Sequence, residues 1–208
     1  MGDTIAFWNW FLANNEDYLN LNDDELTHVK KQKLLDQFLF HLHDYCDKLY
    51  FEIGGWPGQE QELIITADGN KDYFGFVDEL IANAPVIENW QFTAFLQPHE
   101  LDYTSNFEDV ELKPLEMWFL PLNSASQPKL IGLRISLPNY DSVKQSEWLE
   151  AAVFRILDTV LGEKAFALDV DYIDIDALPN NPEEHGMMEL KDLPAFIKWK
   201  KAKLSALQ

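Results

Sequence analysis

The chain has almost no cysteine and little glycine. Its one thiol, Cys46, cannot form an intramolecular disulfide, and a chain without disulfides suits a reducing compartment. Nine glycines in 208 residues leave few positions for loops that wrap around phosphates. The sequence also lacks the glycine-rich motifs of phosphate-binding loops, of dinucleotide-binding folds and of the nucleophile elbow of hydrolases. Nucleotide-dependent enzymes are therefore disfavoured, and the sequence predicts no catalytic residue.

Long hydrophobic runs are missing as well. No stretch approaches the roughly 18 consecutive apolar residues that a membrane-spanning helix needs. Residues 1–6 contain no basic segment followed by an apolar one, as a secretory leader would. We therefore expect a soluble, cytoplasmic protein that does not bind a membrane.

Positive charge is in short supply. The chain carries 16 Lys and Arg against 36 Asp and Glu, a formal net charge of −20. Such a surface repels nucleic-acid phosphates and anionic lipids, so we expect no nucleic-acid partner, and it attracts a basic protein or a cation. Disorder does not explain the acidity, because hydrophobic residues make up 47% of the chain and aromatic residues 13%. The alternative is that the charge serves solubility alone.

The hydrophobic pattern predicts an α+β fold in a single domain over 1–208. Two repeats of a strand–strand–helix–strand order, written ββαβ, are expected to follow two N-terminal helices. The expected ranges are 1–49 for the helical N-terminal part, 50–97 and 114–177 for the two ββαβ units, and 188–205 for a C-terminal helix. We expect the two units to build one mixed or antiparallel sheet of about six strands, covered by helices.

Three local patterns refine this prediction. Asn22 and Glu25 are spaced like a capping box, so the second helix should begin near residue 23. Residues 97–113 are polar and acidic, and they should form an exposed connection inside the domain. Apolar alternation over 165–176 predicts the last strand, with either a bulge or a strand end near Tyr172 and Ile173, where the alternation changes phase.

That last strand carries the best candidates for chemistry. Its carboxylates are Asp169, Asp171, Asp174 and Asp176. Two carboxylates on one face of a strand can share a hard cation such as Mg²⁺ or Ca²⁺, and no other cofactor is indicated. The alternative is a solvated strand face, where paired acidic residues discourage aggregation between sheet edges.

Two tryptophans are candidate binding residues. Trp56 lies in a glycine-rich turn, which can present its ring outward as an anchor for a ligand or a partner; alternatively the ring folds back over the sheet edge. Trp10 falls outside the main apolar stripe of the first helix and could contact a second chain. A lysine-rich stretch, 198–203, interrupts the acidic trend and is expected to dock on the acidic body of the protein.

Several short motifs, two of them rich in aromatic residues, resemble those of a known protein family. They are Phe7-Trp8-Asn9-Trp10-Phe11, Ala84-Pro85, Trp90-Gln91-Phe92-Thr93-Ala94-Phe95, Leu157-Asp158 and Leu161-Gly162-Glu163. In these motifs the chain resembles an uncharacterised family of small bacterial proteins. The resemblance implies an α+β fold and a bacterial cytosolic setting, and it brings no catalytic residue with it.

Three functions remain open from the sequence. The first is a non-enzymatic protein-binding module, in the manner of an immunity or inhibitor protein, that presents an acidic surface to a basic partner. The second is a divalent-metal-binding protein or metal-dependent hydrolase that uses the four aspartates. The third is a small-molecule-binding protein with Trp56 at the rim of its site. The oligomeric state is not indicated by the sequence.

Overall fold

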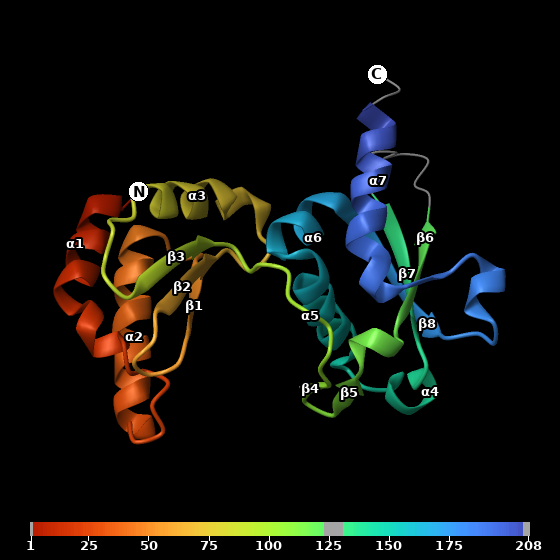
Figure 1. Ribbon diagram of the computed structural model, residues 1–208, viewed down its shortest axis with the longest axis horizontal. Helices are drawn as coiled ribbons and strands as arrows, with labels where there is room; N and C mark the ends of the chain where they lie inside the picture. The colour runs from red at the N-terminus through yellow and green to blue at the C-terminus, as the bar shows by residue number, and fades with distance from the viewer. Residues whose placement is uncertain (1, 123–130, 206–208) are drawn as a thin grey trace. The chain divides into compact units, whose positions relative to one another are not determined.

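The computed structural model of the chain describes residues 2–122 and 131–205, which form a mixed α+β protein, as predicted. The chain divides into two compact units, Met1–Leu96 and Gln97–Gln208. We call them the N-terminal unit and the C-terminal unit and describe each by itself (Figure 1). The sequence predicted one domain over 1–208. The division between the two compact units falls where the acidic connection 97–113 begins.

The N-terminal unit is a three-stranded sheet with helices on one face. Its elements are α1 (Thr4–Asn14), the 3-10 turn η1 (Asn15–Tyr18), α2 (His28–Tyr45), β1 (Tyr50–Gly54), β2 (Gln61–Thr66), η2 (Lys71–Tyr73), α3 (Phe74–Ala82) and β3 (Trp90–Ala94). The strand order is β1-β2-β3, with β1 antiparallel and β3 parallel to β2 (Figure 1). Both β1 and β3 are therefore edge strands.

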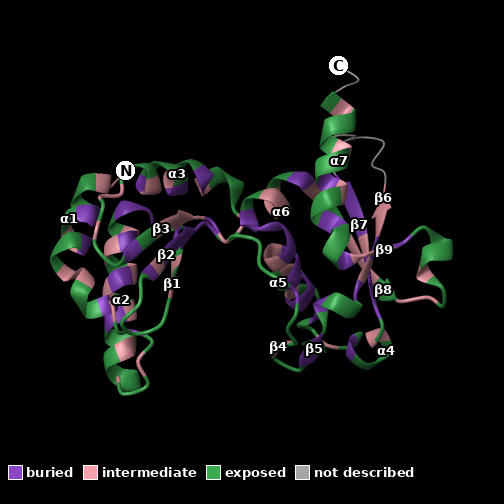
Figure 2. Cartoon of the chain, in the orientation of Figure 1, coloured by how far each residue is buried: buried purple, intermediate pink, exposed green. Residues whose placement is uncertain are grey.

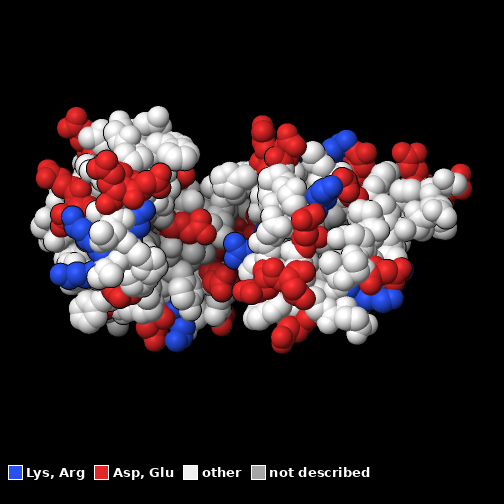
Figure 3. Space-filling model, turned by 90° about the horizontal axis from the view of Figure 1, so that it is seen from below, with Lys and Arg blue, Asp and Glu red and all other residues white. Residues whose placement is uncertain are grey.

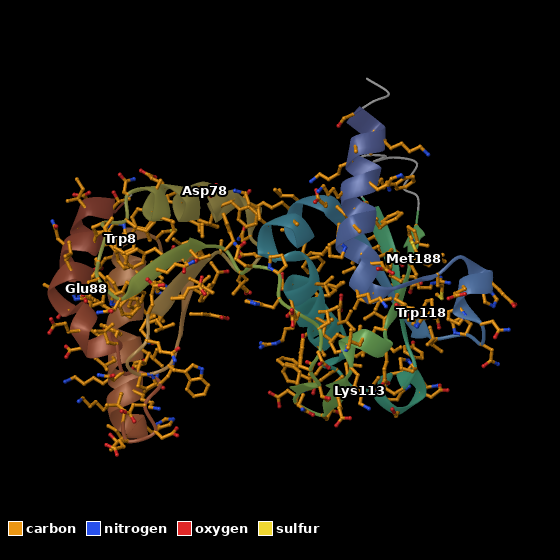
Figure 4. The ribbon with its side chains drawn as sticks, viewed as in Figure 1. Trp8, Asp78, Glu88, Lys113, Trp118 and Met188 are labelled. Atoms are coloured by element: carbon orange, nitrogen blue, oxygen red, sulfur yellow. The ribbon has the colours of Figure 1, made fainter. Side chains whose placement is uncertain are left out.

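Aromatic side chains join the helices to this sheet. Phe38 of α2 is fully buried, and its ring centroid lies 4.0 Å from that of Phe51 on β1. Trp8 of α1, labelled in Figure 4, packs edge-on against Phe92 of β3 at 4.7 Å. Its indole N–H donates to the Leu80 carbonyl of α3 at 2.8 Å. Since side chains alternate across a strand, these contacts place α1 and α2 on the same face of the sheet.

The second helix starts later than the sequence predicted. Its first residue is His28, and Thr27 is the N-cap, whose hydroxyl accepts from the Lys30 amide. The predicted cap, Asn22, lies in the preceding loop, and its side-chain amide instead donates to carbonyls of the β1 hairpin. Thr27 therefore takes the capping role that was predicted for Asn22, in a helix that begins five residues later.

The C-terminal unit is built around a four-stranded sheet. Its elements are β4 (Ser105–Phe107), β5 (Val110–Leu112), η3 (Pro114–Glu116), β6 (Trp118–Leu122), β7 (Ile131–Leu137), α4 (Tyr140–Val143), α5 (Leu149–Leu161), α6 (Glu163–Asp169), β8 (Val170–Ala177), η4 (Pro182–His185), β9 (Met188–Glu189), η5 (Leu190–Asp192) and α7 (Leu193–Ser205). The strand order is β8-β7-β6-β9, and β4 and β5 form a separate pair.

Hydrophobic residues of α5, α7 and β7 form the core of this unit (Figure 2). Along β6, Phe119 points into this core, and its ring lies 5.7 Å from that of Phe196 on α7. Leu193 and Ile197 of α7 are also buried. The prediction that the lysine-rich helix docks within the chain is therefore confirmed for this unit.

Two strand predictions need correction. The described strands lie in three sheets, so the prediction of one sheet with about six strands is wrong. The last strand starts at Val170, because residues 163–169 form helix α6. Gly162, with a φ of +76°, ends α5 as predicted, and strong helix formers follow it. Of the two predicted alternatives, a bulge or a strand end, the structure has the bulge: Ile131 pairs with Val170 and Gly132 with Tyr172, which leaves Asp171 as the extra residue.

None of the helices in the described ranges, 2–122 and 131–205, is both long and apolar enough to cross a bilayer.

Buried tyrosines make the fold sensitive to strong alkali. The hydroxyl of Tyr18 donates to the Leu34 carbonyl at 3.2 Å, and burial, with a smaller contribution from the charge of Asp17, raises the pKa of Tyr18 to about 12. Burial, then the charge of Glu79, also raises the pKa of Tyr45. An unfolded tyrosine has a pKa of about 10, so the folded state holds these protons more tightly.

We therefore expect the free energy of unfolding to fall as the pH rises from about 10 through about 12. The absorbance difference between the wild type and Tyr18→Phe, measured near 295 nm, isolates the ionisation of this phenol. It should appear near pH 12, together with loss of the far-UV circular dichroism. Ionisation near pH 10 with the circular dichroism unchanged would contradict the buried placement of Tyr18.

Candidate functional site

The outer edge of β1 has backbone groups that face away from the sheet. The Phe95 amide donates to the Ile65 carbonyl at 2.8 Å, and the Gln61 amide donates to the Asn89 carbonyl at 2.9 Å. The backbone N–H and C=O groups of residues 61, 63 and 65 of β2 therefore point toward β3. The alternate residues of β2 then pair with β1, opposite Tyr50, Glu52 and Gly54. The peptide groups of Phe51 and Ile53 therefore point outward from the sheet.

Side chains cover the two ends of this edge. At one end, the amide of Asn22 donates to the Gly55 carbonyl at 3.0 Å and to the Ile53 carbonyl at 3.4 Å. At the other end, Nε2 of His43 lies 3.1 Å from the Leu49 carbonyl. Between them, no described residue outside β1 is bonded to the Phe51 amide, the Phe51 carbonyl or the Ile53 amide. These three groups are free to bind a ligand backbone.

A groove runs beside this edge, between β1, α2 and the loop before α2. Its volume is about 470 Å³. The residues that line it are Leu21, Asn22, Lys31, Gln32, Leu35, Asp36, Leu39, Phe51, Glu52 and Ile53. Most of the exposed lining is apolar, and Leu35 and Leu39 follow one row of α2, four residues apart. We call this site the β1 groove.

The rim of the β1 groove is acidic on balance. Asp36 and Glu52 line it against a single lysine, Lys31. Outside the lining, Asp24 and Glu25 of the preceding loop are exposed to solvent, as are Lys30 and Lys33 of α2. Acidic side chains also outnumber basic ones over the visible face of each unit (Figure 3). The groove therefore favours a ligand with positive charge.

Trp56 lies at the turn between β1 and β2, next to the carbonyl that Asn22 holds. The residue is 72% exposed, so the outward orientation, rather than folding over the sheet edge, is the one observed. The buried side chain of Gln61 donates to the carbonyls of Trp56 at 2.8 Å and Gln59 at 3.0 Å, which fixes the turn. Gly55 has a φ of +114°, a conformation that only glycine adopts without strain. The binding role of Trp56 stays a prediction.

Trp10 is part of the aromatic cluster rather than a free surface ring. It is half-buried, stacks on His41 with 4.2 Å between ring centroids, and lies 5.7 Å from Phe38. Packing alone accounts for this tryptophan, and its predicted contact with a second chain stays untested.

The four aspartates predicted to bind a metal are not gathered around one point. Asp169, at the end of α6, accepts two hydrogen bonds from Nζ of Lys201, at 2.8 and 2.9 Å. Asp174 and Asp176 both face Arg134 of β7, which lies 2.7 Å from the first carboxylate and 3.9 Å from the second. The hydrogen bond that Arg134 donates to Asp174, together with the charge of that carboxylate, raises the pKa of Arg134. Asp171 is exposed at the bulge.

Two cations of the chain thus face three of the four carboxylates. Within the described ranges, no group of three or more His, Cys, Asp or Glu side chains is placed to hold a metal ion. The sequence contained a sign that Arg134 pairs with a carboxylate, because it is a single arginine in an apolar strand. Its partner could be assigned only once β7 and β8 were known to be neighbours.

No protein-family model, no curated protein and no solved structure matches the chain significantly.

Proposed function

We propose that the chain is a non-enzymatic protein-binding module, and that the β1 groove takes up a basic segment of a partner protein. The observation that carries the proposal is the combination of an apolar groove with an acidic rim, in a chain of net charge −20. Apolar contacts would supply affinity, and the charge would steer a basic partner and select against acidic ones.

The exposed ring of Trp56 supports the same proposal. Tryptophan is among the residues that most often dominate binding energy at protein interfaces. Gln61 and Asn22 fix the backbone on either side of this turn. A ring held on a rigid turn loses little freedom when a partner binds, so more of its contact energy contributes to affinity.

A synthetic peptide that imitates a basic segment tests the proposal. The probe is a fluorescein-labelled peptide of about ten residues that alternates valine with lysine, and its binding is followed by fluorescence anisotropy. We expect binding that weakens about tenfold between about 50 and 300 mM NaCl, because the attraction is between charges near the surface. The same peptide with glutamate in place of lysine should not bind.

Charge-reversal variants locate the binding site. Glu52→Lys, in the groove, should weaken binding of the lysine probe by about tenfold, which corresponds to about 1.4 kcal/mol. Asp72→Lys changes the net charge equally at an exposed position of η2 outside the groove, so it serves as the matched control. Equal losses in the two variants, or no binding by the wild type, would overturn the proposal.

A further inference from the structure

The free backbone groups of β1 suggest how a segment would lie in the β1 groove. Resting on the proposed function, we infer that the partner segment binds as a fourth strand beside β1. It would bond to the amide and carbonyl of Phe51 and to the amide of Ile53, direct apolar side chains toward α2 and set a basic side chain beside Glu52. An edge strand with unpaired amides and carbonyls is a template for such an addition, and pockets for alternate side chains then give specificity.

The two faces of β1 dictate the alternation of the added strand. The side chain of Phe51 faces α2, as its contact with Phe38 at 4.0 Å shows. Ile53 lies two residues further along the strand, so its side chain is on the same face. Glu52 lies on the opposite face and is exposed. Neighbouring strands share the same pleat, so every second residue of the added strand lies over Leu35 and Leu39, and the residues between them lie beside Glu52.

A second copy of this chain is a poorer occupant than a basic partner. If two copies of β1 paired antiparallel about Phe51, Glu52 would lie opposite Tyr50 and gain no partner of opposite charge. If they paired about Glu52, Phe51 of each copy would face Ile53 of the other. Glu52 would then lie directly opposite Glu52, and like charges in this position destabilise a strand pair. A lysine or arginine at the same place instead forms a cross-strand pair of opposite charge. The acidic centre of the edge therefore selects a basic segment.

The length of the pairing is limited by the two ends of the edge. Asn22 occupies the carbonyls of Ile53 and Gly55, and His43 lies against that of Leu49. Backbone pairing is therefore confined to the stretch between these positions, and residues of the segment beyond it bind through side chains alone. An apolar residue that passes the Asn22 end would come near the ring of Trp56.

Two substitutions at one position test the strand addition. Ile53→Ala and Ile53→Pro both remove the branched side chain, but only proline removes the outward amide. Since this amide is not part of the β1–β2 ladder, proline should be tolerated by the sheet. With the valine–lysine probe, we expect Ile53→Pro to bind at least tenfold more weakly than Ile53→Ala, after circular dichroism has shown that both are folded.

The wild-type protein gives a second test that does not depend on a variant. The probe is N-methylated at alternate residues, in one version at the lysines and in another at the valines. One version blocks the amides that face β1 and should lose at least tenfold in affinity, while the other should bind like the unmodified probe. Equal affinities of the two versions, together with equal binding by Ile53→Pro and Ile53→Ala, would overturn the inference.

The same data separate this inference from the proposed function. If Glu52→Lys weakens binding while the backbone changes do nothing, the groove binds a basic segment in some other conformation. If sedimentation shows a dimer of the wild type that Ile53→Pro abolishes, the edge pairs with a second copy, which also overturns the inference. If the probe does not bind at all, the proposed function itself fails.

Discussion

Replacing Phe38 with alanine is expected to lower the free energy of unfolding of the N-terminal unit by about 3–5 kcal/mol. Phe38 is 0% exposed, so its removal leaves a cavity in a close-packed interior. Five aromatic rings surround it, and edge-to-face pairs among them add to the loss. Their centroids lie between 4.0 and 5.8 Å from that of Phe38: Phe7, Trp10, Phe11, Tyr18 and Phe51.

Phe40 provides the matched control on the same helix. It lies two residues further along α2 and is 63% exposed, so Phe40→Ala should change the free energy of unfolding by less than about 0.5 kcal/mol. Urea denaturation, monitored through the hydrogen exchange of residues 2–96, measures the free energy of unfolding of both variants. Similar losses in the two would contradict the placement of Phe38 at the centre of the aromatic cluster.

Phe38 also links the core to the β1 groove. Its ring supports Phe51, whose backbone forms the free edge of β1. If Phe38→Ala remains folded, we expect it to bind the valine–lysine probe more weakly than Phe40→Ala, because the floor of the groove has lost its support.

Phe119→Ala should have an effect of similar size in the C-terminal unit, again about 3–5 kcal/mol. The ring is 0% exposed and contacts Phe196 of α7. Its removal therefore disturbs the contact of the sheet with the C-terminal helix. Relative to the wild type, amide exchange with solvent should accelerate more in α7 than in α5.

Leu120 is the control for Phe119, because neighbouring residues of a strand point to opposite faces. Leu120 is half-buried, on the face of β6 away from the core. Leu120→Ala should cost about 1 kcal/mol, well below the cost at Phe119, since less apolar surface is lost. Equal costs at the two positions would mean that the faces of β6 are assigned wrongly.

Local structure was largely predictable from the sequence. Helical spacing in the first 49 residues, the capping glycine Gly162 and the phase change near Tyr172 all correspond to features of the structure. The errors arose where two local rules competed. Residues 163–169 satisfy both a strand alternation and a helix made of strong helix formers, and the structure has the helix.

The candidate site was less predictable, because it depends on which strands are neighbours. Trp56 could be found from its glycine-rich turn, whereas the free edge of Phe51 and Ile53 appears only after β1 is placed outside β2. The same limit applies to the aspartates. Their pattern resembles a metal site, but the pairing of β8 with β7 and the docking of α7 bring Arg134 and Lys201 to them instead.

Amide hydrogen exchange at β1 tests the central claim most directly. The amides of Phe51 and Ile53 point outward and should exchange rapidly in the free protein, while the amide of Glu52, bonded to β2, should be protected. On saturation with the valine–lysine probe, exchange at Phe51 and Ile53 should slow by at least tenfold, and that at Glu52 should change little. Unchanged exchange at Phe51 and Ile53 while the probe is bound would contradict the claim that the groove accepts a segment as a fourth strand.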